Sequence, residues 1–164
     1  MHPARSWLVV PVLALITSPT LAQDLLVEKQ LSLAVAQEIA RGAIEKCRAD
    51  GYRVAATVVD RAGRLKVVLR DDGTGPHTLD TSRRKAYTSA TFRTTTIELG
   101  KRLAENPASA ALKDVNDVLV LGGGVPIKAG DEVIGAIGVG GAPGGDKDEV
   151  CAMSGIEKMK DRLK

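Results

Sequence analysis

The chain has 164 residues, two cysteines and a formal net charge of +3, from 23 basic and 20 acidic side chains. This length suits one domain with a proper core, and the nearly balanced charge argues against a nucleic-acid partner. Only 2% of the residues are aromatic, so a site built of stacked rings is not expected. The core must consist of Val, Ile, Leu and Ala.

The first 22 residues have the layout of a cleaved signal peptide. Arg5 precedes an apolar run from Trp7 to Ile16, and small residues follow up to Ala22. The run is shorter than the roughly 20 residues that a membrane-spanning helix needs. We therefore expect a domain over residues 23–164, with no membrane span, in the periplasm or secreted.

Apolar residues recur with helical spacing in four segments and with strand-like patterns in five. The first helix is expected to end at Asp50-Gly51, where glycine favours a left-handed cap. Tight turns join the strands into two hairpins, and a third strand stands alone before Gly122. The predicted elements in chain order are helix 31–49, strands 54–60 and 65–70, helices 79–92 and 97–104, strands 117–121, 125–128 and 133–139, and a last helix that follows Asp146.

Two hairpins predict an antiparallel sheet, and helices at both ends of the chain can cover one of its faces. The expected fold is α+β, a five-stranded antiparallel sheet with helices packed on it, in a profilin-like or PAS-like layout. If the first and last helices lie antiparallel, Cys47 comes near Cys151 and a disulfide can form in an oxidising compartment. Alternatively, both are small buried thiols.

The glycine-rich segment 140–145 lies between a strand and a helix, where a nucleotide-binding loop would be found. Its spacing does not fit a dinucleotide fingerprint, since Pro143 stands where the third glycine belongs, and no Lys-Ser/Thr pair follows. Two interpretations remain. Gly140 and Gly141 either form a flexible connection, or they let the backbone approach a flat ligand or a neighbouring subunit.

His77 is the single histidine after the predicted signal peptide. One histidine and two cysteines cannot supply the four ligands of a structural zinc site, and no serine stands in a nucleophile motif. Alone, His77 can act as an axial iron ligand or as a general base. At a helix N-terminus the dipole disfavours a protonated imidazole, and iron coordination requires the neutral ring. Otherwise it is a solvated loop residue.

Arg83, Arg84 and Lys85 follow His77 within two turns of the predicted helix. Guanidinium groups bind carboxylates through two parallel hydrogen bonds, so this cluster suits a ligand that carries carboxylates, such as the propionates of a porphyrin. The alternative is an ordinary solvated basic face.

Several motifs in this order resemble the GlcG/HbpS haem-binding family, also called haem-degrading, which is related to the C-terminal domain of PduO. They are VVDRAG (58–63), RDDG (70–73), GPHTLDTSRRKAYT (75–88), GGGVP (122–126), IGAIGVGG (134–141) and DEVCA (148–152). Together they cover roughly residues 28–164. At Gly140 the chain departs from the family pattern, where serine is more usual.

The resemblance implies a profilin-like fold, homo-oligomers and binding of haem, with a role in storage, sensing or degradation. It implies no catalytic residues. The site residues that we expect are His77, as cofactor and iron ligand, with Arg83, Arg84, Lys85, Gly140 and Gly141 around the haem. Two alternatives stay open: a lyase acting on a small hydroxylamino-aromatic acid, with His77 as base, and a non-catalytic oligomeric interaction module.

Overall fold

The structure is a computed structural model that describes residues 25–164. The predicted signal peptide, residues 1–22, therefore lies outside the described residues. The helices are α1 (Leu33–Ala49), α2 (His77–Phe92), α3 (Thr96–Glu105) and α4 (Gly145–Glu157), with 3-10 turns η1 (Pro107–Asp114) and η2 (Lys160–Arg162). The strands are β1 (Ala55–Asp60), β2 (Leu65–Arg70), β3 (Gly124–Ala129) and β4 (Glu132–Gly140).

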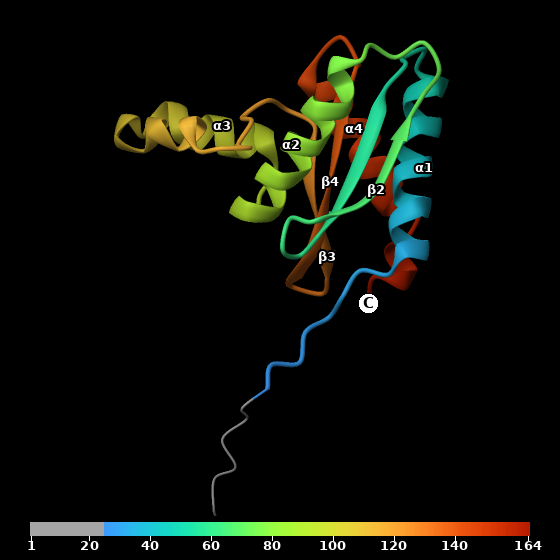
Figure 1. Cartoon of the computed structure of the whole chain (residues 1–164), viewed down its shortest axis with the longest axis horizontal. Helices are drawn as coiled ribbons and strands as arrows, with labels where there is room; N and C mark the ends of the chain where they lie inside the picture. The colour runs from blue at the N-terminus through green and yellow to red at the C-terminus, as the bar shows by residue number, and fades with distance from the viewer. Residues whose placement is uncertain (1–24) are drawn as a thin grey trace, which may run out of the picture.

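The four strands form one antiparallel sheet in the order β2-β1-β4-β3. Both predicted hairpins are present, as β1–β2 and β3–β4. The β4 strand pairs with β1 in a continuous register from Ala55 opposite Gly140 to Asp60 opposite Gly135. This pairing joins the two hairpins into one sheet with β2 and β3 at its edges (Figure 1).

Helices α1 and α4 pack side by side on one face of the sheet (Figure 1). The apolar side chains between them and the sheet make the main core, in which Ile39 and Ile137 are fully buried. Cys47 of α1 and Cys151 of α4 form a disulfide within this layer. The expectation that the first and last helices share one face of the sheet is therefore confirmed, and it brings the two cysteines together.

Helix α2 covers the opposite face of the sheet, against β1 and β4. A Cβ atom on Gly138 would lie 2.0 Å from the carbonyl oxygen of Ser82, so glycine lets α2 approach β4 closely. The Ser82 and Thr57 hydroxyls, 2.8 Å apart, hydrogen-bond across the same contact. The small residues of β4 thus set how deeply α2 sits on the sheet.

The prediction of five strands is wrong, because residues 117–121 form no strand. This segment runs along α2, whose side chains bind two of its backbone polar groups. Arg84 Nη2 donates to the carbonyl oxygen of Val118 over 2.9 Å, and the amide of Leu119 donates to Thr88 Oγ1 over 2.8 Å. A segment whose backbone groups find side-chain partners needs no neighbouring strand.

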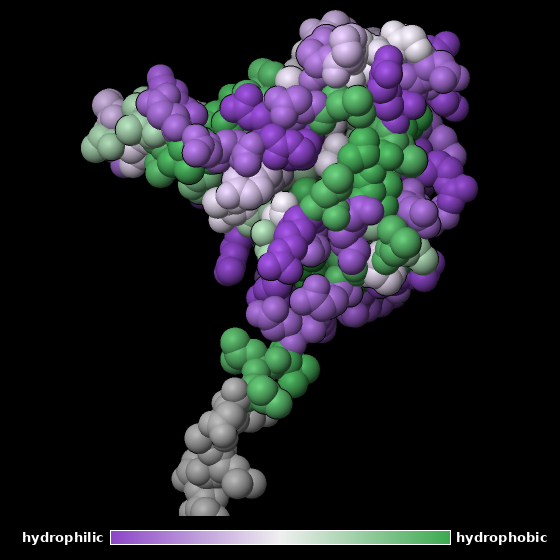
Figure 2. Space-filling view, viewed as in Figure 1, coloured by the Kyte–Doolittle hydropathy of each residue, from purple (hydrophilic) through white to green (hydrophobic). Residues whose placement is uncertain are grey.

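The surface carries apolar residues in two regions visible in Figure 2. On the edge strand β2, Leu65 is 57% and Val68 is 38% exposed. Residues 25–27 extend away from the body, and all three of their apolar side chains are more than 80% exposed. Within residues 25–164, no helix combines the length and apolar character required to cross a bilayer.

Candidate functional site

A hollow of about 270 Å³ opens beside the N-terminal end of α2, and we call it the His77 hollow. It lies where α2, the end of β4 and the start of α4 meet. Its wall includes His77, Thr81, Lys85, Leu121, Asp148 and the glycine-rich segment 140–145. Residues that are far apart in the sequence therefore converge on one concavity.

His77 is the first residue of α2 and is exposed to solvent at this hollow. Pro76 precedes it with φ −64° and ψ −28°, already in the helical region. The imidazole lies close to Gly75: a Cβ on that glycine would be 2.8 Å from the ring carbon Cε1. Gly75 thus leaves room for the ring. The predicted position of His77 at the helix start is confirmed, with the helix beginning two residues earlier than expected.

Lys85 is buried on the wall of the hollow, with 2% of its side chain exposed. Its Nζ donates to Asp148 Oδ2 over 2.7 Å and to the carbonyl oxygen of Val139 over 2.9 Å. An ammonium group has three N–H donors, so one remains after these two bonds. Lys85 is therefore part of the framework of the hollow, whereas the sequence led us to expect it among the cations that bind ligand carboxylates.

Asp148, on the first turns of α4, holds Lys85 and the glycine-rich segment together. Its Oδ1 accepts a hydrogen bond from the Ala142 amide over 3.0 Å. Burial raises the pKa of Asp148, and the Lys85 ammonium and the Ala142 amide act in the opposite direction. The Asp148 carboxylate of α4 is thus hydrogen-bonded both to α2 and to the 140–145 segment.

Gly140 and Gly141 both contribute to the wall, and both lie close to neighbouring protein atoms. A Cβ on Gly140 would lie 2.8 Å from Thr81 Oγ1. Gly141 has φ +131°, and a Cβ there would lie 2.5 Å from the Arg53 carbonyl oxygen. The close approach that these glycines allow is to neighbouring protein atoms.

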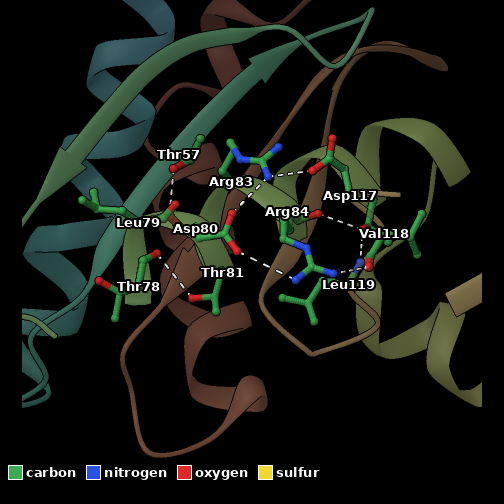
Figure 3. Close-up of polar contacts among 12 residues, drawn as sticks. Thr57, Thr78, Leu79, Asp80, Thr81, Arg83, Arg84, Asp117, Val118 and Leu119 are labelled. Atoms are coloured by element: carbon green, nitrogen blue, oxygen red, sulfur yellow. Dashed lines mark hydrogen bonds and ion pairs between the residues drawn. The ribbon is translucent and has the colours of Figure 1, made fainter. Parts of the chain in front are cut away.

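Arg83 and Arg84 do not line the hollow and are drawn with their partners in Figure 3. Arg83 Nη2 donates to Asp117 Oδ1 over 2.7 Å and to Asp80 Oδ1 over 3.0 Å. The hydrogen bond from Arg83 lowers the pKa of Asp117. Arg84 binds the Val118 carbonyl and lies 3.8 Å from Asp80 Oδ2. The two arginines thus attach Asp117 and Val118 to α2.

The structure thus brings together His77, Lys85, Gly140 and Gly141 from the predicted set, and places Arg83 and Arg84 elsewhere. Sequence reasoning missed Asp148, Thr81 and Leu121. A signal for Asp148 exists: it stands three and four residues before the buried Cys151 and Ala152, so a carboxylate falls on the apolar stripe of a helix. A charged residue in such a stripe needs a buried partner.

A family model described as "Haem degrading protein HbpS-like" matches residues 31–157. Among solved structures, an HbpS variant from Streptomyces reticuli is 40% identical, with a TM-score of 0.79, covering 91% of this chain and 99% of that chain. Protein ORFY from Klebsiella pneumoniae is 25% identical, with a TM-score of 0.80, covering 86% of this chain and 98% of that chain.

A crystal structure of PduOC in complex with haem is also similar, at 22% identity and a TM-score of 0.70. The match covers 79% of this chain and 94% of that chain. At this identity the likeness is one of fold.

Proposed function

Because this chain belongs to the HbpS-like haem-degrading family, we propose that it binds haem at the His77 hollow. The observation that carries the proposal is the exposed imidazole of His77 at the hollow, in a chain of this family. The proposal covers haem storage, sensing or degradation, which share the binding step.

The residues of the hollow fit a haem group held by one protein ligand. Histidine is a common axial ligand of haem iron, and His77 is accessible. Leu121, 49% exposed, offers an apolar contact beside it. Among residues 25–164, no three His, Cys, Asp or Glu side chains gather into a metal site, so a haem would bring its iron already held by the porphyrin. Bound haem would supply redox-active iron, and the protein would supply the imidazole of His77 and the apolar contact of Leu121.

Titration of haem into the purified protein tests the proposal, with His77→Ala as the variant and Leu79→Ala as the control. Leu79 is an exposed neighbour on α2 that does not line the hollow. We expect a Soret band typical of histidine-ligated haem for the wild type and the control, and its loss with at least tenfold weaker binding for His77→Ala. Equal spectra and affinities for all three proteins would remove His77 from the site.

The size of the hollow favours a second candidate, a lyase for a small hydroxylamino-aromatic acid. At about 270 Å³, the hollow lies just below the range of about 300–1,000 Å³ common for ligand pockets, which suits one ring. Lys85 has one N–H left for a substrate carboxylate, and His77 can act as the base. Turnover of such an acid by the metal-free protein, abolished in His77→Ala, would support this function.

We further propose that the protein is exported and forms homo-oligomers. The N-terminal signal pattern and the disulfide both suit an oxidising compartment. The exposed apolar residues of the edge strand β2 and of residues 25–27 suit contacts with a second copy. Sedimentation of the wild type and of Val68→Lys tests the assembly: we expect a smaller particle for the variant, because lysine on an edge strand opposes pairing.

A further inference from the structure

A second hollow, of about 330 Å³, lies at the turn between β1 and β2, and we call it the arginine hollow. Its wall is formed by Glu28, Gln30, Asp60, Arg61, Arg64 and Arg93. The three arginines come from two separate places in the chain, the β1–β2 turn and the C-terminal end of α2. Three arginines thus line one concavity.

Of these three arginines, only Arg61 forms ion pairs with other described residues. Arg61 is paired with Glu132, and its Nε lies 3.6 Å from Glu28 Oε1. Asp60 is committed to the turn, since its Oδ1 accepts from the Ala62 and Arg64 amides, each over 2.9 Å. Among the described residues, the Arg64 and Arg93 side chains take part in no ion pair or hydrogen bond. Arg64 and Arg93 are thus the two cations of the wall that are not paired within the described part of the fold.

The backbone of Arg93 is a second, independent sign of function. Arg93 ends α2 with φ 54° and ψ 33°, in the left-handed region that favours glycine. A residue with a long side chain disfavours this backbone conformation, because its Cβ atom is crowded there. Strain of this kind clusters at binding sites, where the side chain it presents is used.

We propose that the arginine hollow binds a small multivalent oxyanion, a phosphate or a di- or tricarboxylate, through Arg64 and Arg93. Guanidinium groups form paired hydrogen bonds with the oxygens of both classes. Arg61 is held in place at the wall by its ion pairs with Glu132 and Glu28. The amide of Gln30 supplies a further donor.

This site is separate from the His77 hollow. The two hollows share no lining residue and lie at opposite ends of α2. A helix of 16 residues is about 24 Å long, so one small ligand cannot reach both. The inference is therefore independent of haem binding.

Calorimetric titration with inorganic phosphate, and separately with citrate, tests the proposal at low ionic strength. The variants are Arg64→Ala, Arg93→Gly and the double variant, and the matched control is Lys113→Ala, which removes one exposed cation from η1. We expect binding of at least one anion by the wild type and the control, and about tenfold or greater weakening in each single variant, the usual effect of losing hydrogen bonds to a charged group. Binding of only one of the two anions assigns the ligand class.

The Arg93→Gly variant distinguishes a loss of anion binding from a loss of stability. Glycine adopts the left-handed conformation without strain, so this variant should melt at the same or a higher temperature while losing the anion. Equal anion affinity in the wild type and the double variant, or no binding of either anion by the wild type, would overturn the proposal. Haem titration of the double variant should be unchanged, which keeps this result distinct from the test of His77.

Discussion

Lys85 Nζ and Asp148 Oδ2 lie 2.7 Å apart, with less than 5% of either side chain exposed, although the two residues belong to helices on opposite faces of the sheet. The ion pair therefore joins α2 to α4 at the end of β4, where Lys85 also binds the Val139 carbonyl oxygen. Both side chains of this ion pair line the His77 hollow.

Removing one partner of this pair should strongly destabilise the protein. We expect Lys85→Met or Asp148→Leu to lower the free energy of unfolding by about 3–5 kcal/mol, because an uncompensated charge is left buried. The double variant Lys85→Met/Asp148→Leu should lose much less than the sum of two single changes. Urea unfolding of the four proteins measures this.

The exposed pair of Lys158 and Glu45, 2.5 Å apart and about half exposed, is the control for that experiment. Lys158→Ala should change the free energy of unfolding by no more than about 1 kcal/mol, since solvent screens the interaction. Additive effects of the Lys85 and Asp148 substitutions would contradict a coupled pair.

The Cys47–Cys151 disulfide should contribute a large part of the stability. The cysteines are 104 residues apart in the chain, and closing a loop of about 100 residues is worth up to about 4.7 kcal/mol in the chain-entropy model. We expect Cys47→Ala/Cys151→Ala, or the reduced wild type, to unfold at a lower urea concentration. Mass spectrometry without reductant should show the oxidised chain 2 Da lighter than the reduced one, and equal masses would mean that the bond is absent.

Stability should fall in acid through Asp71. Arg48 donates to both of its carboxylate oxygens, over 2.8 and 2.6 Å, and these hydrogen bonds lower the pKa of Asp71 to about 2. A carboxyl whose pKa is lowered by folding stabilises the protein fully above its ordinary pKa of about 4, and that contribution is lost as the pH falls from about 4 to about 2.

The Asp71→Asn variant tests this assignment. At pH 7 it should lose about 1.5–3 kcal/mol, the range for hydrogen bonds to a charged group. Between pH 4 and 2 its stability should fall less steeply than that of the wild type, as measured by urea unfolding at each pH. Parallel pH curves for the two proteins would show that another group causes the acid dependence.

Gly138 should tolerate no side chain, whereas Gly100 should. A Cβ on Gly138 would meet the Ser82 carbonyl oxygen at 2.0 Å and the Ala86 amide nitrogen at 2.5 Å, so Gly138→Ala must push α2 away from β4. We expect a loss of about 1–3 kcal/mol or more. At Gly100 in α3 the nearest atom is Val120 Cγ1 at 3.4 Å, and Gly100→Ala should stabilise the helix by up to about 1 kcal/mol. Thermal unfolding distinguishes the two, and an unchanged melting temperature for Gly138→Ala would contradict the packing.

The amino-acid sequence by itself determined the local elements. Helical periodicity around Ile39 and the glycine turns of the two hairpins depend on nearest neighbours along the chain, and the structure confirms them. The α+β class and the shared face of α1 and α4 followed from the same patterns. His77 at a helix start was predictable because Pro76 fixes the backbone just before it.

Only the tertiary structure decided which polar groups meet. Residues 117–121 have a strand-like composition, yet Arg84 and Thr88 of α2 bind their backbone. Lys85 stands next to two arginines in the sequence, but its side chain turns inward because Asp148, 63 residues away, neutralises it. The pattern of residues along the chain predicts which side chains are buried and where the chain turns. It does not predict which distant residue pairs with a buried charge, and in this protein the pair of Lys85 and Asp148 forms part of the wall of the site.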